Sequence, residues 1–198
     1  IMLILIGCAP TAYALNRTLP TSATPAYVQT ANIAEAAFDA HAGGLPAMAP
    51  ADARKVLTTI KVGKRPRGIG FTPDGKRAYV ACELANQVYA IDVSSHKVIA
   101  VIPAGVRSNG ITVHPKGNMV FVSNGADGTV GVIDTASNKI TKTIKVGDRP
   151  WNMAVSADGK KLYVPNGRSN TVSVIDIDKL EKISDISVGD QPWGVFIP

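Results

Sequence analysis

Arginine recurs at one position of a regular pattern, and it is the residue type here that is best suited to bind a ligand. Arg65, Arg107 and Arg149 lie 42 residues apart, and Gln191 takes the next step. Two residues further on in each step lie Arg67, Asn109, Trp151 and Trp193. Guanidinium groups match the geometry of carboxylates and phosphates, and a nearby indole adds a flat contact surface. The pattern predicts recognition of an anion, carried by a small ligand or by a protein partner.

Other chemistry-bearing residues form no catalytic or metal-binding group. His41, His96 and His114 share no spacing typical of metal ligands, and we expect His96 and His114 at the surface. The sequence has no G-x-S-x-G motif, no P-loop and no complete dinucleotide fingerprint. It also lacks the C-x-x-C-H motif that attaches haem. We therefore predict no catalytic residue, no metal and no cofactor.

The composition is that of a chain with enough hydrophobic residues to form a buried core. Its 198 residues are 45% hydrophobic and 18% charged, with a formal net charge of +6. The two cysteines exclude a disulfide-rich scaffold, and we expect Cys82 to be a buried thiol at the end of a strand. Basic residues are spread over expected hairpin tips such as Lys76-Arg77. This distribution predicts stray nucleic-acid affinity at low salt but no specific nucleic-acid partner.

The first fourteen residues predict export. Residues 1–9 form an apolar run that suits a signal-peptide core, and the chain begins with Ile rather than Met, which indicates a missing start. Residues 5–8 resemble a bacterial lipoprotein box, which would make Cys8 the lipidated residue, whereas residues 12–14 fit an ordinary signal-peptidase site. A buried apolar strand is the competing interpretation. Export predicts a periplasmic or cell-surface protein that meets the membrane only through a lipid anchor.

Residues 15–55 are rich in Ala, Pro and Thr and are interpreted as a linker. One short helix is predicted over residues 32–42, because Asn32 can cap it, Glu35 can return the bond and Gly43 can end it. An irregular start of the following domain is the alternative for this segment.

From residue 56 to residue 198 the sequence repeats every 42 residues. The step is kept at three independent positions: Gly63, Gly105, Gly147 and Gly189; Gly75, Gly117 and Gly159; Asp92, Asp134 and Asp176. A period held without slippage predicts a repeat architecture in which each period is one structural unit.

Each period contains four short apolar runs, which in the first repeat span residues 68–71, 78–82, 88–93 and 98–102. Their length and their Val, Ile and Tyr content favour strands. The P-D-G-K stretch around Gly75 and the A-D-G-K stretch around Gly159 are typical of tight hairpin turns. The repeated aspartates, with Asp74 and Asp158, are interpreted as turn caps rather than as catalytic carboxylates.

Three segments resemble the signature of the YVTN-type β-propeller repeat family: YVAC at 79–82, FVSN at 121–124 and YVPN at 163–166. The frame around them, V-G-x-R-P, x-P-D-G-K and V-x-V-I-D, is also similar, and the likeness covers residues 56–198. The sequence departs from the pattern at Cys82, Ser108 and Lys116. The resemblance implies an all-β fold of about three four-stranded antiparallel blades plus flanking strands.

Propeller blades close into a ring of typically four to eight. We expect three complete blades ending near residue 188, a leading strand at 57–62 and the first strand of a further blade from residue 193. The chain is therefore interpreted as a fragment of a larger ring of about seven blades, with closure by oligomerisation as the alternative.

The resemblance also implies that two sets of loops gather at one mouth of the ring. The candidate binding residues are Arg65, Arg67, Arg107, Asn109, Asn124, Arg149, Trp151, Asn166 and Trp193. Packing between blades is the favoured role for the two tryptophans, and a structural role for the arginine row remains open. Asp148 and Asp190 precede the last two positions of the row and can offset part of its charge, but the first two repeats have Lys64 and Val106 there. We therefore expect a net positive mouth.

Three functions are compatible with these observations. The favoured one is an exported binding module that presents its loop face to a protein or to a small anionic ligand. Resemblance also implies a periplasmic oxidoreductase subunit of the quinoprotein or haem dehydrogenase kind, or a propeller lactonase. A surface-layer structural repeat protein is the third.

Overall fold

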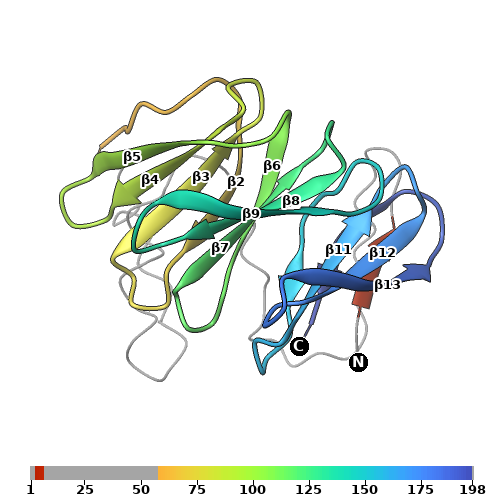
Figure 1. Ribbon diagram of the computed structural model, residues 1–198. Helices are drawn as coiled ribbons and strands as arrows, with labels where there is room; N and C mark the ends of the chain where they lie inside the picture. The colour runs from red at the N-terminus through yellow and green to blue at the C-terminus, as the bar shows by residue number, and fades with distance from the viewer. Residues whose placement is uncertain (1–2, 7–57, 198) are drawn as a thin grey trace, which may run out of the picture. The chain divides into compact units, whose positions relative to one another are not determined.

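The described part of the protein consists of strands and turns, arranged as three successive four-stranded sheets. The computed structural model describes residues 3–6 and 58–197. Each of the three sheets follows sequence order and is antiparallel throughout, so each repeat forms one blade. Figure 1 shows the blades following one another from yellow through green to blue. The predicted set of three four-stranded antiparallel blades is confirmed.

Strand boundaries repeat closely from blade to blade, apart from a shorter first strand in the third blade. The first blade contains β2 (Pro66–Phe71), β3 (Arg77–Cys82), β4 (Gln87–Asp92) and β5 (Lys97–Pro103). The second contains β6 (Ser108–Val113), β7 (Met119–Asn124), β8 (Thr129–Asp134) and β9 (Lys139–Lys145). The third contains β10 (Ala154–Val155), β11 (Lys161–Asn166), β12 (Thr171–Asp176) and β13 (Glu181–Ser187). The strands predicted for the first repeat agree with the structure to within two residues.

The turns have the chemistry that the sequence predicts. Gly75, Gly117 and Gly159 have φ of 68°, 72° and 73°, the left-handed region that glycine enters without strain. The repeated aspartates accept backbone N–H groups three residues on, from Ser95 (2.8 Å), Ser137 (2.8 Å) and Lys179 (3.0 Å). Their interpretation as turn caps is confirmed.

Neighbouring blades approach each other most closely at their first strands. A Cβ on Gly68 would lie 2.3 Å from the backbone oxygen of Asn109, and one on Gly110 would lie 2.7 Å from that of Trp151. Asn152 takes this position in the third blade, and it forms an isolated parallel bridge with Gly194. Small residues thus allow the first strands to pass side by side near the centre of the arc.

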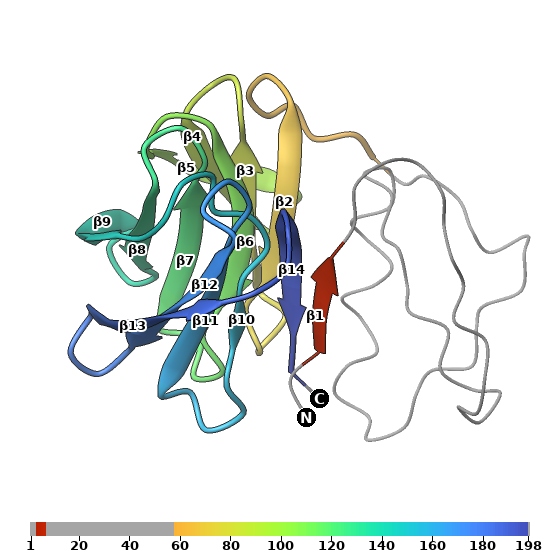
Figure 2. The same ribbon diagram turned by 90° about the vertical axis from the view of Figure 1, so that its right-hand side faces the viewer.

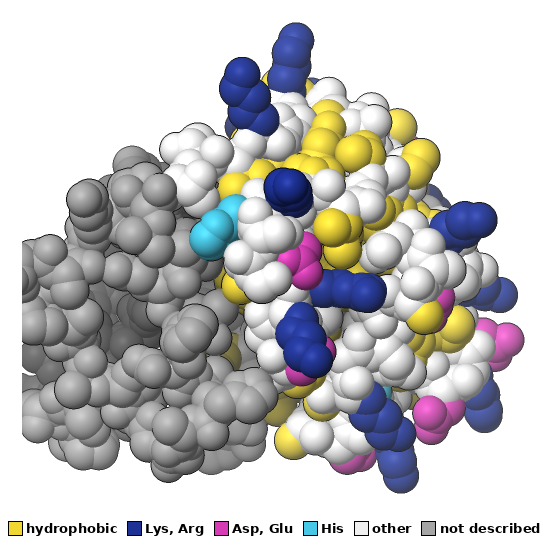
Figure 3. Space-filling view, turned by 90° about the vertical axis from the view of Figure 1, so that its left-hand side faces the viewer, with side chains coloured by type: hydrophobic (Ala, Val, Ile, Leu, Met, Phe, Trp, Pro, Cys, Tyr) yellow, Lys and Arg dark blue, Asp and Glu magenta, His cyan; other side chains and the backbone are white. Residues whose placement is uncertain are grey.

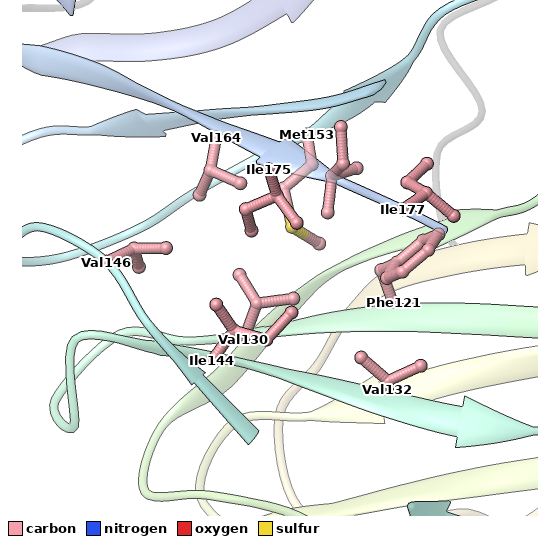
Figure 4. Packing of buried hydrophobic residues seen from close by; sticks show 10 residues of the cluster. Phe121, Val130, Val132, Ile144, Val146, Met153, Val164, Ile175 and Ile177 are labelled. Atoms are coloured by element: carbon pink, nitrogen blue, oxygen red, sulfur yellow. The ribbon is translucent and has the colours of Figure 1, made fainter. Parts of the chain in front are cut away.

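Hydrophobic side chains fill the space between blades. Figure 4 shows Ile144 and Val130 of the second blade facing Ile175 and Val164 of the third, with Met153 beside them. A second cluster joins the first and second blades in the same way, through residues such as Ile102 and Val122. Burial of these faces against one another holds the blades together.

The last described strand, β14 (Pro192–Phe196), contacts β10 and β11 and takes the place of the first strand of a further blade. Its antiparallel partner is β1 (Leu3–Ile6), which lies beside it in Figure 2. Residues 3–6 of the N-terminal apolar run therefore form a strand, as the competing interpretation of this run predicted. Export is not tested by this pairing and stays a prediction.

The leading strand expected at 57–62 is wrong over residues 58–62, which form no strand. These residues correspond to the outer strand of a preceding blade, and an outer strand has only one neighbour in its own sheet. The described residues contain no third strand that could pair with it. Ile60 and Val62 nevertheless pack against the first blade.

His114 corrects a second expectation, because it is 4% exposed rather than at the surface. Its Nδ1 accepts a hydrogen bond from the Lys116 backbone N–H (3.1 Å), and its Nε2 lies 3.0 Å from the Gly159 oxygen of the next blade. An Nδ1 that accepts leaves the proton on Nε2, which then donates to that oxygen. The ring is buried because it ties two blades together.

Several predictions concern residues outside the described part. These are lipidation at Cys8, the helix at 32–42, and the signal and linker segments apart from residues 3–6. Within the described ranges there is no helix long and apolar enough to cross a membrane. On the face next to the first blade, Figure 3 shows Lys and Arg side chains separated by other residues rather than gathered in one patch.

Candidate functional site

The arginine row lies in the turns that lead into the first strand of each blade. Arg65, Arg107 and Arg149 have φ of 58°, 58° and 57°, and Gln191 has 51°. Such values are uncommon for residues other than glycine. Each arginine carbonyl accepts a hydrogen bond from the residue that follows the second strand of its blade: Glu83 (2.9 Å), Gly125 (2.9 Å) and Gly167 (3.0 Å). These bonds join the two predicted loop sets into one surface, the mouth.

Asparagine side chains accept backbone hydrogen bonds from two of these turns. Asn86 accepts the backbone N–H of Arg107 through Oδ1 at 2.9 Å, and Asn170 accepts that of Gln191 at 3.0 Å. Their own φ values are 55° and 54°, a conformation that asparagine tolerates better than most residues. The positions of Arg107 and Gln191 are therefore held by the turn between the second and third strands of the preceding blade.

A single buried carboxylate receives three of the arginines. Glu83 is 6% exposed, and its Oε2 lies 3.2 Å from the Nε atoms of Arg65 and of Arg67. Nη1 of Arg107, from the second blade, donates to Oε1 at 3.3 Å. Among the described residues Oε2 has no aligned hydrogen-bond donor, although both charges lie close to it. The carboxylate is held mainly by ion pairing.

Beside this cluster the mouth is hollowed into a pocket of about 410 Å³. Its lining consists of Glu83, Arg107, Asn109, Gly125, Ala126, Arg149, Pro150, Trp151 and Arg168. Glu83 is the acidic member of this lining, against three arginines. We call Arg65, Arg67, Arg107, Arg149 and Arg168 the arginine rim.

The two tryptophans of the sequence are stacked together at the edge of this pocket. Their ring centroids are 5.0 Å apart and their planes differ by 11°. Trp151 is 8% exposed and Trp193 is 50% exposed. Guanidinium carbons of Arg149 and Arg67 lie 4.9 Å and 5.8 Å from the Trp151 ring centroid, which is cation–π distance. Trp151 is packed as expected, whereas half of Trp193 faces solvent.

The predicted asparagines divide into two groups. Asn109 lines the pocket, although its side chain is largely buried. Asn124 and Asn166 lie inside their blades, with 1% and 0% exposure. Asn124 accepts the Gly105 backbone N–H at 3.1 Å, and the amides of both donate to threonines of the next strand. The structure thus places these two behind the mouth rather than on it.

Glu83 is the site residue that the sequence analysis missed. The sequence pointed to Asp148 and Asp190 as carboxylates that could offset part of the arginine charge. Neither is ion-paired with an arginine in the described residues, and Asp190 accepts a hydrogen bond from Asn170. A signal was present, because Glu83 stands where the other two repeats have Gly125 and Gly167. An acidic residue that interrupts a glycine position of a repeat is worth inspecting.

Other reactive side chains lie away from the mouth or are covered. Cys82 is fully buried, and this burial raises the pKa of its thiol. Within residues 58–197 no three His, Cys, Asp or Glu side chains gather into a group that could hold a metal. The side chains gathered at the mouth are arginines, two stacked indoles and one carboxylate.

Comparison with known proteins gives a family and a structural neighbour. A family model described as "Lactonase, 7-bladed beta-propeller" matches residues 37–192. Among solved structures the chain is similar to a chain of the hydrazine synthase of Kuenenia stuttgartiensis, with 29% identity and a TM-score of 0.63. That likeness covers 68% of this chain and 39% of the other, so the chain spans well under half of this neighbour. None of the curated proteins matches.

Proposed function

The chain belongs to the seven-bladed β-propeller family named for lactonases, and on that premise we propose that its mouth binds a small anionic ligand. The observation that carries the proposal is the pocket of about 410 Å³ lined by three arginines and a single carboxylate. Pockets of roughly 300–1,000 Å³ suit small molecules. Arginine forks in such a pocket match a carboxylate or a phosphate group.

The charge at the mouth supports this proposal over a purely structural role for the arginine row. Glu83 pairs with Arg65, Arg67 and Arg107, whereas Arg149 and Arg168 have no ion-pair partner among the described residues. Both of these arginines are exposed and line the pocket, so the positive charge that Glu83 does not offset faces the pocket.

The test is replacement of Arg65, Arg107 and Arg149 by Gln in the full-length protein. Titration calorimetry with citrate and with inorganic phosphate is expected to give binding to the unmodified protein and none to the variant. Binding should weaken between 50 and 500 mM NaCl, because salt screens exposed charges. Equal binding by the two folded proteins would contradict the proposal.

Lactone hydrolysis is the second candidate function, and the family name favours it. Opening of a lactone ring needs a water molecule activated by a base and a donor for the developing oxyanion. Glu83 is the carboxylate of the pocket, and its three lining arginines are the candidate donors. A pH-stat assay with γ-butyrolactone and δ-gluconolactone tests this function, and a loss of turnover in Glu83→Gln would support it.

The oxidoreductase alternative draws on the likeness to a hydrazine synthase chain, and it concerns a whole protein longer than this chain. We further propose that the repeats are of the YVTN type. The signature positions support this, because Asn124 and Asn166 play the same hydrogen-bonding role in successive blades.

We also propose export, with Cys8 as the lipidation site, on the basis of the apolar run and the Cys-containing box in the sequence. Expression of the complete gene with labelled palmitate tests the anchor. A label-free, soluble product that begins at Leu15 would favour ordinary secretion.

A further inference from the structure

Glu83 occupies a position at which the blade fold requires no side chain. The second and third blades have Gly125 and Gly167 at this place, and the same backbone hydrogen bond to the arginine carbonyl forms in all three blades. The carboxylate is therefore not needed to make the turn. It extends from the end of β3 toward the pocket, which it lines.

The arginine rim is divided by its contacts with this carboxylate. Arg65 and Arg67 hold Glu83 at 3.2 Å but do not line the pocket. Arg149 and Arg168 line the pocket but form no ion pair among the described residues. Arg107 does both, because it lies in the lining and contacts Glu83 at 3.3 Å.

The Glu83 carboxylate is held by ion pairs rather than by a complete set of hydrogen bonds. Glu83 is buried, yet its Oε2 has no aligned donor among the described residues. Buried charged groups are normally satisfied by both charge and hydrogen bonds. Arg65 and Arg67 therefore hold this oxygen by charge and proximity, at 3.2 Å, without an aligned hydrogen bond.

Resting on the proposed function, we propose that Glu83 is a built-in anion that sets the affinity of the mouth for carboxylate and phosphate groups. It offsets one positive charge on the blade-one side of the rim and competes for Arg107. An incoming anion is thereby directed to Arg149 and Arg168, next to the stacked tryptophans. Loss of the Glu83 charge frees Arg107 for the ligand and strengthens anion binding.

The two tryptophans supply a local readout, since both lie at the mouth and the sequence contains no others. Iodide is an anionic quencher of tryptophan fluorescence, and acrylamide is a neutral one. The ratio of their quenching constants, compared with the same ratio for free N-acetyltryptophanamide, measures how strongly the mouth concentrates anions. Inorganic phosphate should reduce iodide quenching by competition.

The central variant is Glu83→Gln, which keeps the size of the side chain and removes its charge. We expect the iodide-to-acrylamide ratio to rise about threefold, the effect of one unit charge about 6 Å away in a water-like dielectric. The rise should disappear in the double variant Glu83→Gln with Arg107→Gln. Arg168→Gln alone should lower the ratio below that of the unmodified protein.

Two further variants separate this local effect from net charge and from misfolding. Glu83→Gln with Arg65→Gln keeps the net charge of the mouth unchanged and is expected still to raise the ratio, because Arg65 lies outside the pocket. Glu181→Gln, at the opposite end of the third blade, removes one exposed carboxylate and should change nothing. If Glu83→Gln alone fails to fold, the ratio measured for Glu83→Gln with Arg65→Gln tests the proposal in its place.

A ratio that is unchanged or lower in a folded Glu83→Gln protein overturns the role of Glu83, even where the unmodified protein concentrates iodide. A ratio equal to that of free tryptophan in every variant overturns anion binding at the mouth itself. The two failures are therefore distinguishable.

Discussion

At the scale of single residues, the turn aspartates show how local bonding lowers the pKa of a carboxyl group. Hydrogen bonds from the hydroxyl groups of Ser94 and Ser95, with one from the Ser95 backbone, lower the pKa of Asp92 to about 2. The pKa of Asp134 is lowered in the same way by Ser137. Because the unfolded group titrates near 3.8, the stabilisation is present above that pH and is lost as the pH falls toward 2.

We predict that Asp92→Asn lowers the melting temperature at pH 7 and that the difference from the unmodified protein shrinks between pH 4 and pH 2. An asparagine resembles the protonated aspartic acid, so the two proteins converge once Asp92 is neutral. Thermal unfolding followed by circular dichroism at several pH values measures this. Asp178→Asn is the control, since Asp178 accepts no hydrogen bond among the described residues. A pH-independent difference would contradict the prediction.

Cys82 gives a second prediction at this scale. Its thiol is fully buried, and burial raises its pKa, so the reactive thiolate is scarce at neutral pH. Iodoacetamide at pH 8 should leave residue 82 unmodified in the folded protein and should modify it fully in urea, as peptide mass spectrometry can show. Fast labelling of the folded protein would indicate that the blade opens at β3.

The residues that could be predicted are those whose role is local. Asp92 and Gly75 act within their own turn, and Cys82 ends an apolar strand, so the chain next to them is sufficient to assign them. His114 could not be assigned in this way, because its partner Gly159 comes from the neighbouring blade. Glu83 likewise contacts Arg107 of the second blade, in addition to two arginines of its own blade. Side-chain contacts across repeats are set by the ring geometry, which a single period does not encode.

At the scale of elements, the 42-residue step predicted the blades because each strand and turn is specified inside one repeat. The leading strand at 58–62 failed for the opposite reason, since an outer strand needs a third strand to pair with. β10 is also short, with two residues where β2 and β6 have six. Asn152 replaces the glycine found there in the other blades and donates its backbone N–H to Trp193 instead (3.3 Å).

The close approach of first strands leads to a prediction at the level of elements. Gly110→Ala should lower the free energy of unfolding by about 1–3 kcal/mol, because the new Cβ would lie 2.7 Å from the Trp151 oxygen and the blades must separate to admit it. Gly194→Ala is the matched control at the equivalent position, where the nearest described atom is 3.8 Å away. Urea unfolding of both variants measures the difference, and equal costs would refute a glycine requirement at this crossing.

At the scale of the whole molecule, the exposed fraction of one repeated isoleucine depends on whether the next blade covers it. Ile102 and Ile144 are 2% and 5% exposed, and each belongs to a cluster shared with the following blade. Ile186, at the same position of the third blade, is 38% exposed. The residue types are identical, so the difference comes from the presence or absence of a packed neighbour among the described residues.

This comparison gives a prediction for the assembled molecule. Ile144→Ala should cost about 2–5 kcal/mol, the usual range for a buried isoleucine, whereas Ile186→Ala should cost under about 1 kcal/mol in the dilute 198-residue chain. If copies of the chain complete a ring by association, Ile186 becomes covered, and its cost should rise with protein concentration together with the mass measured by light scattering. In a longer protein whose further blades complete the ring, the two substitutions should cost nearly the same at every concentration. A large, concentration-independent cost of Ile186→Ala in the 198-residue chain would mean that covering by a following blade does not set the energy at this position.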